Sequence, residues 1–186
     1  MEFFVGNTAS RRMARFDQFE QNACRAINRS SRYRAIAGFF AAVSRLGDGV
    51  LWYSLMALLP LLYGTYGLEA SAVMATASLV GLLTYKMMKT RMVRERPCVT
   101  HPDILLGTAP LDRYSFPSGH TLHAVLFTTI AVTYFPGLAA VLIPFTVLVA
   151  LSRVVLGLHY PSDVVVGAVI GWGLAKAALN VVPPLL

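Results

Sequence analysis

Long apolar runs separated by short polar segments make up most of the chain from residue 50 onward. A helix needs about twenty mostly apolar residues to cross the hydrocarbon core of a bilayer, which is about 30 Å thick. No Asp, Glu, Lys or Arg occurs between Arg113 and Arg153, which leaves room for two such helices divided by a turn at Pro136-Gly137. The whole pattern predicts five spans, at residues 50–66, 70–88, 118–135, 138–152 and 163–182.

The first 34 residues follow a different pattern. They are polar and rich in arginine, and apolar residues recur among the charges at roughly helical spacing, at Phe16, Phe19, Cys24 and Ile27. This spacing predicts an amphipathic helix on the membrane surface. Residues 35–44 are apolar but too few to cross a bilayer, so we expect a half-buried or re-entrant helix that ends at Gly47-Asp48-Gly49.

The predicted fold is therefore all-α, a polytopic membrane bundle of about five transmembrane helices with N-terminal interfacial helices. Residues 1–48 form the interfacial part and residues 49–186 form the bundle. An alternative topology makes residues 33–50 a sixth span. It places Arg45 and Asp48 inside the membrane, which is costly for charged side chains.

Composition and charge narrow the class of protein. Hydrophobic residues make up 56% of the chain, and only 13% are charged, whereas a soluble domain carries about 25% charged residues. The net charge is +7, and five antiparallel spans place fifteen of the sixteen Lys and Arg residues on one side. No nucleic-acid-binding motif accompanies this charge, which points to anionic lipid or a phosphorylated substrate rather than nucleic acid. The two cysteines, Cys24 and Cys98, are expected to be free thiols.

Three short clusters on the cationic side carry residues suited to chemistry. The first contains Lys89 and Arg96-Pro97, the second is Pro117-Ser118-Gly119-His120, and the third runs from Ser152-Arg153 through His159 to Asp163. Lys89 and Arg96 are two helical turns apart, so they share a face if the helix continues until Pro97 stops it. Ser118 is a good N-cap, and a helix N-terminus attracts anions.

These residue types match the needs of phosphoryl transfer. Charge develops on the phosphoryl oxygens and can be neutralised by fixed cationic donors. The available donors are Lys89, Arg96, Arg153 and the backbone N–H groups near Ser118 and Gly119. One histidine can attack phosphorus while a second protonates the leaving oxygen. A carboxylate such as Asp163 can orient the attacking ring. No metal-ligand spacing is present, so we expect chemistry without a metal or another cofactor.

Together and in this order, the three clusters resemble the signature of the type 2 phosphatidic acid phosphatase (PAP2) superfamily. The resemblance covers residues 89–163 in motifs and most of the bundle in architecture. It implies that His159 is the nucleophile, that Asp163 orients it, and that His120 is first the general acid and then the base. It also implies that the phosphate is held by Lys89, Arg96, Ser118, Gly119 and Arg153. Outside the motifs, His123 is expected to pack within the bundle. Simple solvent or headgroup contacts are expected for Arg91, Arg94, Glu95, His101, Asp103, Asp112 and Arg113.

The resemblance implies a membrane lipid phosphatase that acts on an isoprenoid diphosphate such as undecaprenyl diphosphate, on phosphatidate or on phosphatidylglycerophosphate. A lipid phosphotransferase with the same site and a catalytically silent lipid-binding or transport protein are the alternatives. The expected partners are the lipid phosphate and the bilayer, and the sequence carries no signal for an oligomeric state. The positive-inside rule favours a cytoplasmic site, whereas the resemblance implies the outer, periplasmic side of the cell membrane, which we expect here.

Overall fold

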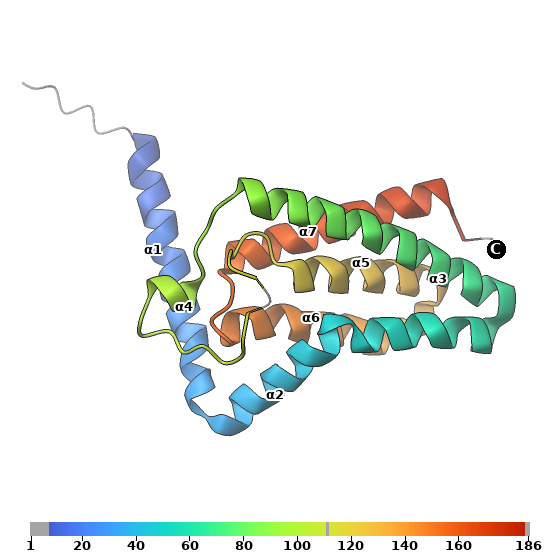
Figure 1. Cartoon of the computed structure of the whole chain (residues 1–186), viewed down its shortest axis with the longest axis horizontal. Coiled ribbons are helices and arrows are strands. Elements are labelled where there is room, and N and C mark those ends of the chain that lie inside the picture. Colours follow the sequence, from blue (N-terminus) through green and yellow to red (C-terminus); the bar gives the residue numbers. More distant parts are fainter. Residues whose placement is uncertain (1–7, 111, 185–186) are drawn as a thin grey trace, which may run out of the picture.

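The computed structural model describes residues 8–110 and 112–184, and the regular elements in this part of the chain are all helical (Figure 1). The all-α prediction is therefore confirmed. The α-helices are α1 (Thr8–Asn28), α2 (Arg34–Arg45), α3 (Leu51–Arg91), α4 (Pro97–Thr100), α5 (Gly119–Tyr134), α6 (Ala139–Val155) and α7 (Pro161–Val181). Short 3-10 or π-type turns are η1 (Arg29–Arg32), η2 (Leu46–Val50) and η3 (Pro136–Leu138).

The long helix α3 folds back on itself as a hairpin. Gly64 has φ 59° and ψ −134°, which a residue with a side chain rarely adopts, and the chain reverses there. The two limbs lie so close that a Cβ on Gly67 would be 2.0 Å from the carbonyl oxygen of Leu59. The Ser71 hydroxyl donates to the carbonyl of Met56 across the limbs at 2.8 Å. The limbs correspond to the predicted segments 50–66 and 70–88.

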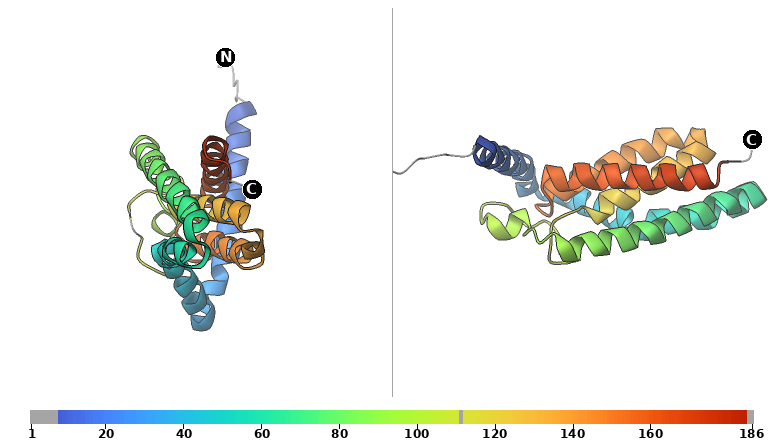
Figure 2. Two further views of the ribbon diagram at one scale, coloured as in Figure 1. Left: turned by 90° about the vertical axis from the view of Figure 1, so that its right-hand side faces the viewer. Right: turned by 90° about the horizontal axis from the view of Figure 1, so that it is seen from above.

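Helix α5 runs through the middle of the bundle, between α3, α6 and α7 (Figure 2). Helix α5 packs closely on α7 because α7 carries two glycines, Gly167 and Gly171, in a Gly-x-x-x-Gly spacing. This spacing lets membrane helices pack backbone to backbone. A Cβ on Gly167 would lie 2.6 Å from the Ser118 carbonyl oxygen, and one on Gly171 would lie 2.2 Å from that of Leu122. This close crossing holds the start of α5 against the start of α7.

The outer surface of the bundle is apolar. Leu61, Val141, Val165 and Val169 are each at least 60% exposed, which is normal for lipid-facing side chains. Within residues 8–110 and 112–184, three stretches are long and apolar enough to cross a membrane, namely Arg34–Arg91, Pro136–Val155 and Pro161–Val181. The protein is therefore a multi-pass membrane protein.

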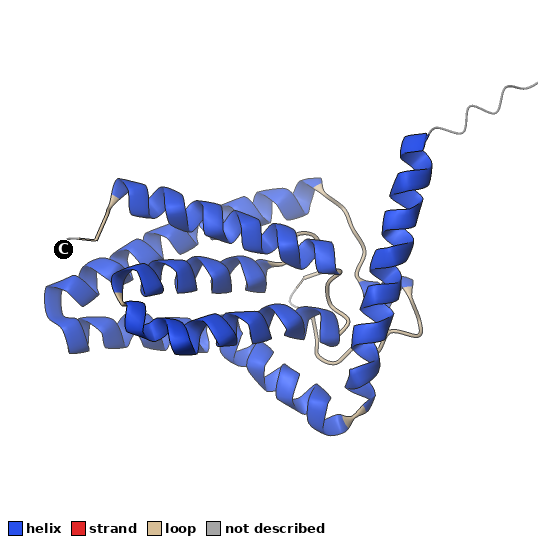
Figure 3. Ribbon diagram, turned by 180° about the vertical axis from the view of Figure 1, so that it is seen from behind, coloured by secondary structure: helices blue, strands red, loops and turns tan. Residues whose placement is uncertain are grey.

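The N-terminal region crosses one end of the bundle. Helix α1 lies crosswise to the long axis of the bundle, and α2 leads obliquely from it to α3 (Figure 3). The predicted amphipathic segment starts at residue 1, and its first seven residues lie outside the described part. Phe16 and Phe19 are exposed, as expected for a helix on a membrane surface. The predicted break at Gly47-Asp48-Gly49 coincides with η2.

The helix that carries Lys89 does not continue to Arg96-Pro97, which was the condition for a shared face of Lys89 and Arg96. Helix α3 ends at Arg91, residues 92–96 are not helical, and Pro97 starts α4 rather than stopping the preceding helix. The residue before a proline is pushed toward extended backbone, and Arg96 has φ −76° and ψ 151°. Lys89 and Arg96 therefore do not share a helix face, although a different contact brings them together, as described below.

Candidate active site

The end of the bundle under α1 gathers the candidate residues from five places in the chain. Lys89 lies at the end of α3 and Arg96 in the following loop. Ser118, Gly119 and His120 start α5, Arg153 lies near the end of α6, and His159 and Asp163 flank the start of α7. The contacts below bring together side chains that are far apart in sequence, such as those of Arg96 and His159, which are 63 residues apart.

His159 sits in a tight loop between α6 and α7. Gly157 has φ 72°, which allows the chain to turn back, and the N–H of His159 donates to the Arg153 carbonyl at 3.1 Å. The ring is only 2% exposed. Burial lowers the pKa of His159 to about 4, against the opposing effect of the Asp163 carboxylate. The ring is thus neutral at ordinary pH, the form that a nucleophile requires.

The carboxylate of Asp163 is fully buried behind the His159 ring. Its Oδ2 lies 3.6 Å from His159 Nδ1, which is a close contact but too long for a hydrogen bond. The same oxygen accepts the Tyr160 N–H at 2.8 Å and the hydroxyl of Ser115. Arg94 donates to Oδ1 at 2.8 Å. Three hydrogen bonds and the contact with the His159 ring therefore hold the carboxylate in place.

Arg94 connects this carboxylate to α1. Its second terminal nitrogen donates to Glu20 at 2.5 Å, and its guanidinium lies over the Tyr160 ring, 4.1 Å from the centroid. Glu20 is 3% exposed and also accepts the N–H of Ser162 at 2.7 Å. The prediction that Arg94 makes only loop or headgroup contacts is wrong. Its guanidinium forms ion pairs with two buried carboxylates, those of Glu20 and Asp163.

One face of α1 packs on the loop that carries His159. Glu20, Cys24 and Asn28 are one helical turn apart, and all three are buried. The amide of Asn28 donates to the Val155 carbonyl at 2.8 Å, and the Cys24 thiol lies 3.8 Å from the His159 carbonyl. Burial raises the pKa of Cys24 to about 12, so the thiol stays protonated. Both cysteines are free thiols, as predicted.

Lys89 and Arg96 meet at a carboxylate that the sequence analysis placed in solvent. Arg96 donates to Asp112 Oδ1 at 2.8 Å, and Lys89 and the Tyr85 hydroxyl also donate to this carboxylate. Burial opposes ionisation of Asp112, but the hydrogen bonds from Lys89 and Tyr85 outweigh it and hold its pKa below the usual range. A carboxylate that bridges two cations occupies the kind of site that a phosphate would take.

Arg153 and the start of α5 complete the cationic lining. Arg153 is 3% exposed and donates to the Ser44 hydroxyl, while its Nε is buried with no partner among the described residues. A buried unpaired donor is costly, and a phosphate oxygen would satisfy it. Ser118 is the predicted N-cap residue, but its hydroxyl pairs with Thr121 at 3.0 Å and its N–H donates to the Asp163 carbonyl. The first helical N–H group of α5 belongs to Gly119.

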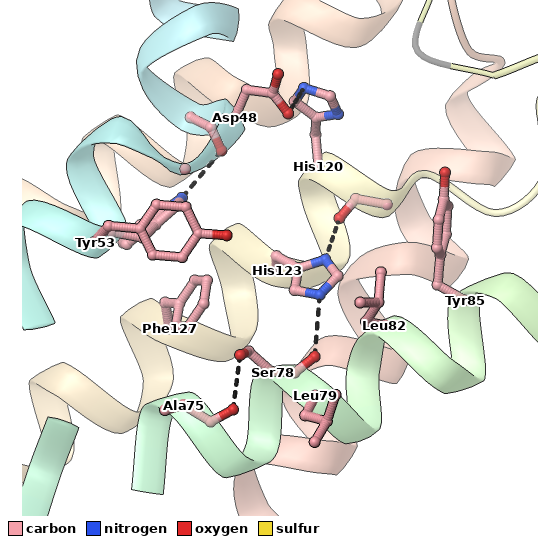
Figure 4. Close-up of a pocket in the computed structure, with 14 residues that line it drawn as sticks. Asp48, Tyr53, Ala75, Ser78, Leu79, Leu82, Tyr85, His120, His123 and Phe127 are labelled. Atoms are coloured by element: carbon pink, nitrogen blue, oxygen red, sulfur yellow. Dashed lines mark hydrogen bonds and ion pairs between the residues drawn. The ribbon is translucent and has the colours of Figure 1, made fainter. Parts of the chain in front are cut away.

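A cavity of about 430 Å³ opens beside His120 (Figure 4). Polar groups of Asp48, Tyr85 and His120 lie at one end, and its walls are mainly apolar side chains from α3 and α5, including Trp52, Leu79, Leu82 and Phe127. His120 Nε2 lies 3.2 Å from Asp48 Oδ1. His123 pairs with the carbonyl of Gly119 at 2.9 Å, within the bundle as predicted. The arrangement suits an amphiphile with its head at His120 and its chain along the cavity.

Five residues that contact the candidate site were not predicted to do so from the sequence, namely Glu20, Asp48, Tyr85, Arg94 and Asp112. The Gly-Asp-Gly triplet around Asp48 was a usable signal, because two flanking glycines allow a carboxylate to project from a helix break. Arg94 and Asp112 carry no comparable local signal, since their partners are distant in sequence.

Comparison with known proteins agrees with this geometry. A family model described as the PAP2 superfamily matches residues 67–185. The chain is 44% identical over 85 residues to a decaprenylphosphoryl-5-phosphoribose phosphatase of Mycolicibacterium smegmatis, covering 44% of this chain and 43% of that protein. It is 32% identical over 139 residues to an undecaprenyl-diphosphatase of Sulfolobus acidocaldarius, covering 72% of this chain and 65% of that protein. The matches thus span less than two thirds of these relatives' own lengths.

Among solved structures, LpxE from Aquifex aeolicus superimposes with a TM-score of 0.70 at 26% identity. That match covers 86% of this chain and 93% of LpxE. Glu20 and Asp48 lie before the first residue that the family model matches.

Proposed function

Because the chain belongs to the PAP2 superfamily, we propose that it is an integral-membrane lipid phosphatase that works through a phosphohistidine at His159. The substrate class is a lipid phosphomonoester or diphosphate. The observation that carries the proposal is the convergence of a neutral, buried His159 with Lys89, Arg96 and Arg153. A nucleophile and fixed cationic donors are the parts that phosphoryl transfer requires.

The proposed reaction has two steps. His159 Nε2 attacks phosphorus and forms an N–P bond while the P–O bond to the lipid breaks. Asp163 stabilises the cationic ring that results, and His120 gives a proton to the departing lipid oxygen. His120 then takes a proton from a water molecule that attacks the phosphohistidine, which releases inorganic phosphate and restores neutral His159.

The phosphate would replace Asp112 in the cationic site. Lys89 and Arg96 lose one anionic partner and gain another, so the exchange leaves neither cation unpaired. Arg153 Nε, which is unpartnered within the described chain, and the N–H at Gly119 would hold the remaining oxygens. Ser118 contributes by placing the helix start rather than through its hydroxyl, which is bonded to Thr121.

We further propose an isoprenoid phosphate or diphosphate as the substrate. The relatives named above include enzymes for decaprenyl and undecaprenyl lipids. The walls of the cavity beside His120 are mainly apolar, which suits a lipid chain. The lipid would lie with its chain between α3 and α5 and its phosphate at the polar end.

The topology that accompanies this proposal has five spans, formed by the two limbs of α3 and by α5, α6 and α7. It places the site at the outer face of the cell membrane. Cysteine reporters test the orientation in a Cys24→Ala, Cys98→Ala background. Asp103→Cys should react with an impermeant maleimide in intact cells, whereas Thr65→Cys, at the α3 turn, should react only after lysis. The reverse pattern would place the site in the cytoplasm.

The activity test is phosphate release by the purified protein in detergent with excess chelator. Undecaprenyl diphosphate, phosphatidate and phosphatidylglycerophosphate are offered separately, with His159→Ala as the control. We expect release from the isoprenoid substrate that survives the chelator and is absent in His159→Ala. Equal release by the variant would contradict the proposal. Release that requires an added acceptor lipid would indicate a phosphotransferase instead.

A further inference from the structure

The break between α2 and α3 turns a carboxylate toward the proposed general acid. Asp48 projects from η2, and its Oδ1 lies 3.2 Å from Nε2 of His120, at the polar end of the cavity (Figure 4). This contact joins residues 72 positions apart, and Asp48 lies before the segment that the family model matches. The catalytic signature in the sequence does not include this carboxylate.

The break is packed rather than loose. Asp48 has φ −82° and ψ 19°, and Gly49 has φ 126°, a conformation that favours glycine. Gly47 lies against α6, where an added Cβ would be 2.7 Å from the Val149 side chain, and its carbonyl accepts the Trp52 indole N–H at 3.1 Å. Backbone and side-chain contacts therefore hold Asp48 at a defined position.

The same junction also supports the phosphate-binding side of the site. Ser44 lies one helical turn before Asp48, and its hydroxyl accepts from Arg153. Two polar side chains of this junction thus contact two different residues of the proposed machinery. A junction that only joined two helices would have no need of either contact.

His120 needs such a partner because cations surround it. The guanidinium groups of Arg153 from α6 and Arg96 from the 92–96 loop lie near its ring. Positive neighbours oppose the protonated ring that a general acid must be. A carboxylate in contact with one ring nitrogen offsets them and fixes the orientation of the ring.

We propose that Asp48 is the positioning residue of His120. Its carboxylate accepts the Nε2 proton and leaves Nδ1 to pass a proton to the departing lipid oxygen and later to take one from water. The Nε2 proton stays between His120 and Asp48 throughout, so only one proton is exchanged in each step. This inference rests on the proposed phosphatase activity.

The test compares two substrates in Asp48→Asn. The leaving group of undecaprenyl phosphate, a monoester, is a lipid alkoxide, which needs a proton from the general acid His120. The leaving group of p-nitrophenyl phosphate is a stable anion that needs no proton. We expect turnover of undecaprenyl phosphate to fall by about a hundredfold, at the lower end of the usual contribution of a general acid. The first-turnover burst of nitrophenol should be unchanged, because His159 still attacks.

Three comparisons keep the result interpretable. Asp48→Asn made in a His120→Gln background should cost nothing further, since Asp48 acts through that ring, and Asp48→Glu should recover part of the activity. Glu69→Gln is the control, because this carboxylate lies on α3 and accepts a hydrogen bond from the Tyr134 hydroxyl at 2.9 Å rather than contacting His120.

An equal loss of burst and turnover in Asp48→Asn would show a merely structural role and overturn the inference. Wild-type kinetics in Asp48→Asn would overturn it as well. No phosphate release by the wild type from either substrate is a different result, because it removes the proposed phosphatase activity together with the inference.

Discussion

Arg96 Nη1 lies 3.3 Å from His159 Nε2, so a guanidinium N–H faces the lone pair of the proposed nucleophile. The other terminal nitrogen of Arg96 binds Asp112 at 2.8 Å. Arg96 therefore contacts both Nε2 of His159, the proposed attacking atom, and the carboxylate of Asp112. An entering phosphate that takes over Arg96 would uncover Nε2 at the moment when phosphorus arrives.

The first prediction concerns Asp112 as a competitor of phosphate. Asp112→Asn removes the negative charge that bridges Lys89 and Arg96. An oxyanion then no longer has to displace it, so orthovanadate should inhibit the variant at about tenfold lower concentration, which corresponds to about 1.4 kcal/mol. Asp103 lies in the same loop as Asp112, but it is exposed and pairs with Arg25 of α1, so Asp103→Asn should bind vanadate as the wild type does. Weaker vanadate inhibition of Asp112→Asn would mean that this carboxylate supports anion binding.

The second prediction concerns the contact of α1 with the loop that carries His159. Glu20→Gln removes the charge opposite Arg94 and weakens the acceptor for the Ser162 N–H. Because Arg94 is 30% exposed and solvent screens part of the pair, we expect a loss of only about 1–3 kcal/mol, the range for a buried polar group that loses a partner. Thermal unfolding in detergent measures this loss. Asp17→Asn, on the exposed side of the same helix, should unfold at the wild-type temperature, and an equal shift in both variants would argue against a specific role of Glu20.

The third prediction concerns the α5–α7 crossing. Gly171→Ala places a methyl group 2.2 Å from the carbonyl oxygen of Leu122, so the backbone must move to admit it. Overpacking of this kind costs about 1–3 kcal/mol, so the unfolding temperature should fall. Activity should fall too, since α5 carries His120. Gly173→Ala is two residues away with nothing within 4 Å of the added methyl group, and it should be neutral. Equal stability of the two variants would contradict the close crossing.

The fourth prediction is the titration of His159. Burial lowers its pKa to about 4, whereas an unperturbed histidine titrates near pH 6.5. Carbon-13 labelling of the four histidine rings, with His159→Gln to assign the signal, should show a midpoint near pH 4. Because the unfolded chain takes up this proton first, the free energy of unfolding should fall as the pH drops from about 6.5 toward 4. A midpoint above pH 6 would mean that the ring is more hydrated than the structure shows.

The apolar pattern predicted most of the fold because the bilayer imposes its length on each segment. The predicted spans 118–135, 138–152 and 163–182 differ from α5, α6 and α7 by three residues or fewer at each end. The predicted span 70–88 ends three residues before α3 does, but the sequence left open whether the helix continues from Lys89 to Pro97. A proline restricts its neighbour but does not say how far upstream the helix has already ended.

The site was predictable only where its residues form local motifs. His120, His159 and Asp163 lie in short clusters with recognisable spacing, whereas Arg94 meets Glu20 across 74 residues and Asp48 meets His120 across 72. Such contacts depend on how α1 and η2 pack on the bundle. Asp112 looked like a solvated loop acid because nothing nearby in sequence reveals that the loop folds back over Lys89.

The central claim is that His159 carries the phosphoryl group, and trapping the intermediate tests it most directly. His120→Gln lacks the base that activates water, so it should accumulate the phosphoenzyme when mixed with p-nitrophenyl phosphate, whose leaving group needs no acid. Denaturation at alkaline pH preserves phosphohistidine, and tandem mass spectrometry then locates the group. The account predicts phosphate on His159 of the trapped protein and none in the His120→Gln, His159→Ala double variant. Phosphate on any other residue, or a wild type that turns over while His120→Gln carries no phosphate, would contradict it.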